Sequence, residues 1–209
     1  MEIRDILMSI RPPWPEMIFS GEKPFEFRNH IGRNWGAGSR LYIYESKAYN
    51  GAGMVVGDAT IDEIVSIPAG AVGPPRPLLR YWAEKYAPWF IPLLDELGDY
   101  ELPNYKKGTI LRYLGRPELL REAMRTGAWV QMFDEGHNPI DACEHWLFRI
   151  GLINGCGEYW YKYGLRLSNA RKYASPLPLS AFGLNRAPQS WCYTGGPLNV
   201  ANNNETEGG

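Results

Sequence analysis

Hydrophobic and polar positions in the first part of the chain form short runs that predict strands around one short helix. Residues 6–10 are an apolar run bounded by prolines, which is typical of a short buried strand. Apolar residues at helical spacing over 14–18 predict a helix that ends at Gly21, because glycine readily adopts the left-handed conformation found after helices. Two aromatic residues then alternate with two charged ones over 25–28, which predicts a strand with an apolar and a charged face.

Further strands are expected on both sides of the middle of the chain. Residues 41–45 are rich in β-branched and aromatic types, and 54–67 form a long strand or bent pair in which Gly57 is a plausible bulge. Alternation returns at 164–168, and 190–193 predicts a final strand beside the first ones. Several short strands with turn signals between them favour a small, closed or nearly closed β-barrel.

The middle third has a different pattern and predicts a helical insertion. Prolines and glycines over 68–77 interrupt the strand pattern, and helical spacing follows. The helical segments expected are 78–86, 93–97, 117–125 and 141–153. The domain organisation predicted is a barrel from 1–67 and 160–194, an insertion over 76–159 and a disordered tail over 195–209, where Asn, Gly and Glu dominate.

Composition limits the classes of function. The 209 residues include 44% hydrophobic and 13% aromatic residues, enough for a full core, and the net charge of −1 provides no global field for a polyanion. If nucleic acid binds, the basic surface is local. Three cysteines are too few for a disulfide scaffold, and no run reaches about 20 apolar residues. We expect no signal peptide, because charged residues precede only a brief apolar run at the start of the sequence. We therefore expect a cytoplasmic protein with no membrane partner.

Lys23, Glu26 and Arg28 are the main candidates for chemistry. They would gather at the mouth of the barrel, where an ammonium can hold a phosphate or carbonyl oxygen, or transfer a proton if burial lowers its pKa. Arg28 can bind phosphate through its planar fork, and Glu26 can accept a base amino group or a proton. The structural alternatives are an exposed Lys23 paired with Glu22 or Glu26, and an ion pair between Glu26 and Arg28 that only fixes the strand end.

Two stretches resemble the ASCH family of the PUA-like superfamily. The first is the Gly-x-Lys-x-x-Glu-x-Arg run formed by Gly21, Lys23, Glu26 and Arg28, after a strand and a short helix. The second comprises residues 176–183 and 186–193, similar to segments that close the domain in bacterial and phage-borne members. The resemblance covers about residues 4–67 and 160–194. It implies an α+β fold, a small PUA-like barrel with short flanking helices, interrupted here by the helical insertion.

The resemblance implies a module that binds RNA, other single-stranded nucleic acid or a modified nucleoside in a cleft between strands. Gln189 offers the donor and acceptor that recognition of a base edge requires. The ligand-binding residues expected are Arg11, Trp14, Lys23, Arg28, Lys47, Arg186, Gln189 and Ser190. No cofactor is expected. His137, Cys143, His145 and Cys156 lack a Cys-x-x-Cys pair, so we expect no metal site.

Two alternatives remain open. Some ASCH proteins are amidohydrolases that remove acyl groups from N4-acylated cytidines with a Lys, a Thr and a Glu, and another is a metal-aided ribonuclease. On that reading Lys23, Glu26 and Glu84 are the catalytic candidates. Glu26 stands where those enzymes have threonine, so Lys23 would activate water instead. Their glutamate lies in a helix after the central strands, and Glu84 is assigned to it by position alone. The other alternative is a protein-interaction adaptor that binds its partner through the helical insertion.

Overall fold

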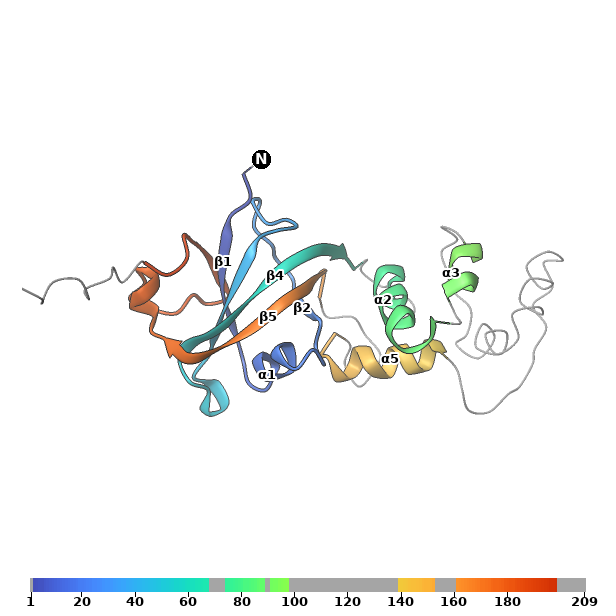
Figure 1. Cartoon of the computed structure of the whole chain (residues 1–209), viewed down its shortest axis with the longest axis horizontal. Coiled ribbons are helices and arrows are strands. Elements are labelled where there is room, and N and C mark those ends of the chain that lie inside the picture. The colour runs from blue at the N-terminus through green and yellow to red at the C-terminus, as the bar shows by residue number, and fades with distance from the viewer. Residues whose placement is uncertain (1, 68–73, 89–90, 98–138, 153–160, 199–209) are drawn as a thin grey trace, which may run out of the picture. The chain divides into compact units, whose positions relative to one another are not determined.

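A computed structural model describes residues 2–67, 74–88, 91–97, 139–152 and 161–198. By its contacts the chain divides into two compact units, residues 1–66 with 163–209, and residues 67–162 (Figure 1). The strands of the first unit are β1 (Asp5–Ile10), β2 (Phe25–Arg28), β3 (Arg40–Glu45), β4 (Met54–Ser66), β5 (Tyr163–Leu177) and β6 (Trp191–Thr194), with the helix α1 (Trp14–Phe19) between β1 and β2. The α+β class expected from the sequence is confirmed.

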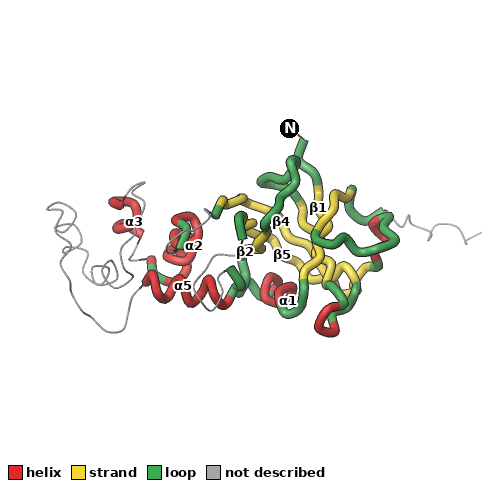
Figure 2. Tube along the Cα trace, turned by 180° about the vertical axis from the view of Figure 1, so that it is seen from behind, coloured by secondary structure: helices red, strands yellow, loops and turns green. Residues whose placement is uncertain are grey.

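The strands form one mixed sheet in the order β2-β5-β4-β3-β1-β6. β1 pairs in parallel with β3, and the other neighbours are antiparallel. The sheet curls into a half-barrel, with β2 and β6 as its end strands (Figure 2). β6 lies beside β1, as the sequence predicts, because Ile6 faces Tyr193 and Met8 faces Trp191 in the register.

Gly57 lies at a break in the register of β4. The pairing of β4 with β5 shifts between Val55 and Gly57, which confirms the expected irregularity. A Cβ at Gly57 would lie 2.3 Å from the carbonyl oxygen of Arg171 and 2.5 Å from the ring of Phe19. Since real Cβ contacts are never this short, only glycine lets β5 and the end of α1 approach this strand together.

Alternate residues of β1 enter two different hydrophobic clusters. Ile6, Met8 and Ile10 belong to a cluster on one face of the sheet that also contains Ile18 of α1. Leu7 points the other way, into a cluster that includes Phe182 of the 3₁₀ turn at Leu179–Phe182. Burial on both faces explains why the sequence of β1 is a continuous apolar run rather than an alternating one.

β5 is longer than expected. The alternation of apolar residues predicts a strand over 164–168, whereas the strand runs from Tyr163 to Leu177. Its second half is mostly polar and exposed, so it has no hydrophobic period, but it still pairs with β4 as far as Val55 opposite Leu177. Backbone pairing rather than side-chain burial extends this strand.

The second unit contains α2 (Arg76–Tyr86), α3 (Ile91–Leu97) and α5 (Pro139–Arg149), which correspond to three of the four helices expected there. The helix expected over 117–125 lies outside the described residues. Leu78, Leu79, Trp82 and Ala83 form the buried side of α2. Among the described residues, no helix has both the length and the apolar character needed to cross a membrane.

Candidate functional site

The turn after α1 positions the first candidate residue. Gly21 has φ +76°, and its N–H donates to the carbonyl of Ile18, so the helix ends where the sequence predicts. The N–H of Lys23 then donates to the carbonyl of Met17 at 2.8 Å, which brings the chain back toward the helix before β2 begins. The helix end and the strand therefore fix the backbone on both sides of the Lys23 side chain.

Lys23 is buried against two aromatic rings. Only 3% of the residue is exposed, and its Nζ lies 5.1 Å from the ring centre of Trp14 and 4.4 Å from that of Phe27. Burial lowers the pKa of Lys23 to about 8, and the nearby Glu26 carboxylate opposes part of that effect. The structure therefore rules out the exposed lysine of the structural alternative, and the ammonium can exchange its proton near neutral pH.

Glu26 joins the two cations. Its Oε1 accepts from Arg28 NH2 at 2.8 Å, and its Oε2 lies 3.7 Å from Lys23 Nζ. Glu26 is 6% exposed, so the carboxylate is held by these partners in a poorly hydrated environment. With Lys23 protonated, the three side chains carry a net charge of +1, which favours an anionic or electron-rich ligand group.

Arg28 links β2 to the segment before β6. Its NH2 donates to the carbonyl of Ser9 at 2.9 Å, and its NH1 donates to the hydroxyl of Ser190 at 3.3 Å. Ser9 is in turn tied to the same segment, since its hydroxyl donates to the carbonyl of Pro188 at 2.7 Å and its N–H to that of Ser190 at 2.8 Å. The guanidinium thus links β2, one end strand of the sheet, to the residue that precedes β6, the other end strand.

Five of the expected site residues are therefore close together: Trp14, Lys23, Glu26, Arg28 and Ser190. We call Lys23, Glu26 and Arg28 the charged triad. The other ligand-binding candidates have exposed side chains outside this network: Arg11, Lys47, Arg186 and Gln189. Sequence reasoning missed Ser9, because its contribution is partly a backbone carbonyl that no side-chain pattern reveals.

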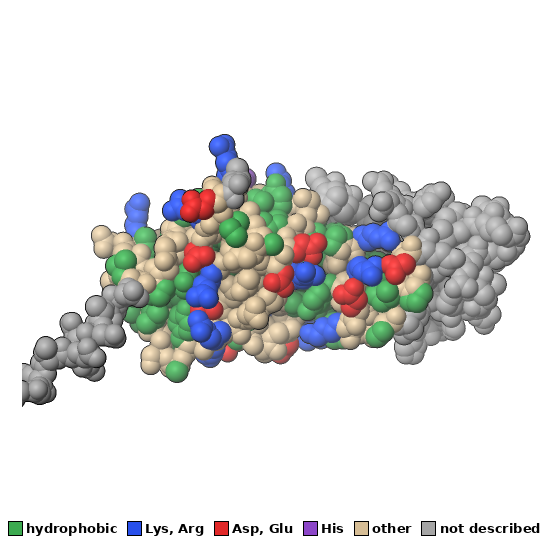
Figure 3. Space-filling model, turned by 45° about the horizontal axis from the view of Figure 1, so that its top comes forward, with side chains coloured by type: hydrophobic (Ala, Val, Ile, Leu, Met, Phe, Trp, Pro, Cys, Tyr) green, Lys and Arg blue, Asp and Glu red, His purple; other side chains and the backbone are tan. Residues whose placement is uncertain are grey.

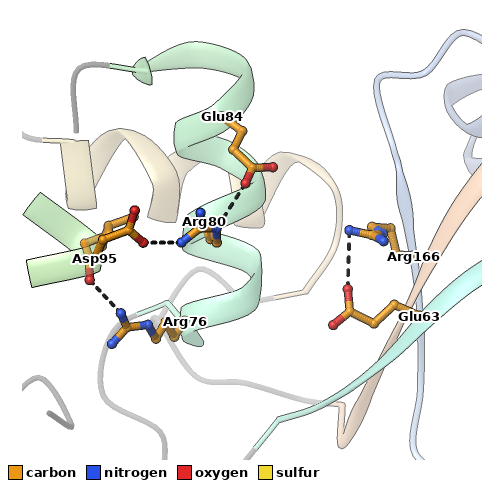
Figure 4. Close-up of polar contacts among 7 residues, drawn as sticks. Glu63, Arg76, Arg80, Glu84, Asp95 and Arg166 are labelled. Atoms are coloured by element: carbon orange, nitrogen blue, oxygen red, sulfur yellow. Dashed lines mark hydrogen bonds and ion pairs between the residues drawn. The ribbon is translucent and has the colours of Figure 1, made fainter. Parts of the chain in front are cut away.

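Glu84, the third catalytic candidate, belongs to the second unit. It is an exposed residue of α2, and its carboxylate accepts from Arg80 Nε at 3.0 Å (Figure 4). Arg80 also pairs with Asp95 of α3, so Glu84 is part of an ion-pair group on the surface of this unit. Exposed pairs of this kind contribute little to stability.

A second polar cluster was not expected from the sequence. Asp58 of β4 is buried, and its Oδ2 accepts from Arg171 NH2 at 2.7 Å and from the hydroxyl of Tyr173 at 2.6 Å. Burial and the neighbouring Asp58 raise the pKa of Tyr173 above its ordinary range. The signal in the sequence was an acidic residue directly after the apolar start of β4, at Asp58.

The charges on the surface are mixed. Figure 3 shows Lys and Arg side chains interspersed with Asp and Glu on the face that it displays, without a broad area of one sign. This distribution agrees with the net charge of −1. Attraction of a polyanion to this face would depend on local groups rather than on a broad charged area.

The fold and site define an α+β protein with a curled six-stranded sheet and a buried Lys-Glu-Arg triad beside one edge. No protein-family model matches the chain, and neither does any curated protein. Among solved structures, the chain is similar to the crystal structure of ASCH from Zymomonas mobilis, with 15% identity, 91% of this chain and 87% of that chain covered, and a TM-score of 0.41. A point mutant of the same protein is 14% identical, with 91% and 89% covered and a TM-score of 0.41. These structures carry the name of the family that the motif from Gly21 to Arg28 resembles.

Proposed function

We propose that the chain binds single-stranded nucleic acid, RNA in the first place, or a modified nucleoside, at the charged triad and the Ser190 segment. The observation that carries the proposal is the burial of Lys23 and Glu26 in contact with Arg28, which itself reaches Ser190. Burying two charged side chains against a third is costly, and a hydrophobic replacement would often be at least as stable. A ligand-binding role gives a reason for this arrangement.

The chemistry of each group suits one part of a nucleotide. Arg28 is the planar cation of the triad; its NH2 is held by Glu26 and the Ser9 carbonyl, so the NH1 group beside Ser190 is the part that would reach a phosphate. Glu26 can accept from a base amino group, and Lys23 can donate to a base carbonyl or a phosphate oxygen. Trp14, which already contacts Lys23, offers an aromatic surface beside these groups.

The direct test is fluorescence anisotropy with labelled single-stranded RNA and DNA, together with thermal-shift screening of a nucleoside panel. We expect Lys23→Ala and Arg28→Ala to weaken binding, and affinity for RNA to fall with added salt because phosphate neutralisation releases counterions. Arg33→Ala, which changes an exposed arginine of the first unit, is the matched control and should bind like the wild type. Absence of binding to every oligonucleotide and nucleoside would refute the proposal.

A second candidate is hydrolysis of a nucleoside amide or of RNA, and the lowered pKa of Lys23 is the observation that favours it. With a pKa of about 8, a useful fraction of Lys23 is neutral near physiological pH and can take a proton from water. Incubation with N4-acetylcytidine or with RNA should then give a new chromatographic peak that Lys23→Ala abolishes. Unchanged substrate at high protein concentration would exclude this activity for those substrates.

A further inference from the structure

Two aromatic residues lie on one face of the end strand β6. Trp191 and Tyr193 are two positions apart, so their side chains point to the same side of the sheet. They pair in the register with Met8 and Ile6, and both pack against the hydrophobic cluster to which those residues belong. Both nevertheless remain partly exposed, so part of each side chain can be reached from solvent.

An arginine lies at each end of this aromatic pair. Beside Trp191, Ser190 accepts a hydrogen bond from Arg28 of the charged triad. At the other end, the guanidinium of Arg4 lies over the ring of Tyr193, 4.6 Å from its centre. Arg28, Trp191, Tyr193 and Arg4 therefore follow one another along the edge of the sheet, and we call this set the edge stripe.

The loop between β2 and β3 holds the aromatic pair in place. Trp35 packs against Trp191 with its ring at 70°, and the ring centres are 4.8 Å apart. The N–H of Asn34 donates to the hydroxyl of Tyr193 at 3.0 Å. Gly32 allows this contact, because a Cβ there would lie 2.4 Å from that hydroxyl. The rings are thus ordered before any ligand arrives.

We infer that the edge stripe is a stacking surface for the bases of single-stranded RNA, with Trp191 as its principal contact and the two arginines binding phosphates. This inference rests on the proposed function and extends it from the charged triad to β6. Proteins that bind single strands combine cations that follow the backbone with aromatic rings on which bases stack. The two rings on β6, with an arginine from another part of the chain at each end, supply both elements.

The experiment separates stacking from phosphate contacts. Two labelled probes are used, an octamer of riboadenosine and an abasic octamer with the same number of phosphates. We expect Trp191→Leu to weaken binding of the adenosine octamer roughly five- to one-hundredfold, the loss of one stacked base, and to leave the abasic octamer almost unchanged. Arg28→Ala should weaken both probes. Tyr49→Leu removes an exposed aromatic residue elsewhere in the same unit and should change neither.

A second variant keeps the inference testable if Trp191→Leu does not fold, and a mononucleotide tests whether the site binds more than one nucleotide. Trp191→Phe keeps a ring, so we expect it to retain most of the affinity, and the quenching of tryptophan fluorescence by the adenosine octamer should be smaller than in the wild type. Adenosine 5′-monophosphate should bind more weakly than the octamer, because it occupies only part of the edge stripe. An equal affinity would assign the site to a free nucleotide and overturn the inference.

The failure of this inference can be distinguished from the failure of the proposed function. If Arg28→Ala weakens both probes while folded Trp191→Leu binds the adenosine octamer as tightly as the wild type, stacking at β6 is wrong and the triad still binds. Quenching that is unchanged in Trp191→Phe leads to the same conclusion. If the wild type binds neither probe nor any nucleoside, both proposals are wrong.

Discussion

The burial of Lys23 makes a quantitative prediction about stability and pH. In the unfolded chain this lysine has its ordinary pKa of 10.5, whereas burial lowers the pKa to about 8 in the folded protein. Between these values the unfolded state binds more protons than the folded state, so stability rises with pH. Below pH 8 both states hold the proton, and this contribution no longer changes.

The expected size follows from the two pKa values. A lowering from 10.5 to about 8 corresponds to roughly 3 kcal/mol in the free energy of unfolding, gained between these pH values. Other groups titrate in the same range, so the quantity to compare is the difference between the wild type and Lys23→Met. The free energy of unfolding from urea titrations, followed by circular dichroism at several pH values between 7 and about 10.5, measures it.

Lys47→Met provides the control, because Lys47 is exposed and belongs to the same unit. The free energy of unfolding of Lys47→Met should change with pH as that of the wild type does. Parallel curves for the wild type and Lys23→Met between pH 8 and 10.5 would show that Lys23 is not desolvated, and the case for a proton-transfer role would lose its basis. A fall in wild-type stability relative to Lys23→Met would contradict the sign of the argument.

Three other substitutions test the site and the sheet by urea denaturation. Glu26→Gln should lower the free energy of unfolding by about 3–5 kcal/mol, because it leaves the buried Lys23 and the partly buried Arg28 without their carboxylate. Glu16→Gln in the exposed pair with Lys172 should lower it by no more than about 1 kcal/mol, and equal losses would contradict the burial argument. Gly57→Ala should lower the free energy of unfolding by about 1–3 kcal/mol or more, because its Cβ would overlap the carbonyl oxygen of Arg171. Gly195→Ala is the control and should leave the free energy of unfolding nearly unchanged, because a Cβ there meets no atom within 4 Å. Tyr173→Phe should cost about 1.5–3 kcal/mol, the range for a hydrogen bond to a charged group; an unchanged midpoint would mean that water replaces the phenol.

Local patterns were sufficient to predict most of the first unit. The apolar run of β1, the helical spacing before Gly21 and the alternation in β2 each define an element within a few residues, and the structure confirms all three. The charged triad followed for the same reason, because short offsets across one turn and one strand bring its members together. Such contacts depend on local geometry, which the order of residues largely determines.

Long-range contacts were harder to predict. The hydrogen bond from Arg28 to the carbonyl of Ser9 depends on how the sheet curls, and the polar half of β5 depends on its partner strand. The exposed positions of Arg186 and Gln189 depend on the path of a loop. Periodicity along the chain carries no information about these features, since each depends on residues far apart in sequence.

The second unit, residues 67–162, begins and ends next to paired positions of β4 and β5. Ser66 faces Tyr163 in the register, and the next N–H, that of Ile67, donates to the carbonyl of Lys162 at 2.7 Å. Antiparallel strands that end at such paired positions are commonly joined by a tight hairpin turn. The second unit thus takes the place of a turn, and any autonomous module whose ends lie about 5 Å apart fits the same junction without shifting a single strand. Gene rearrangement can therefore replace the second unit by another module while the strands of the first unit keep their hydrogen bonds.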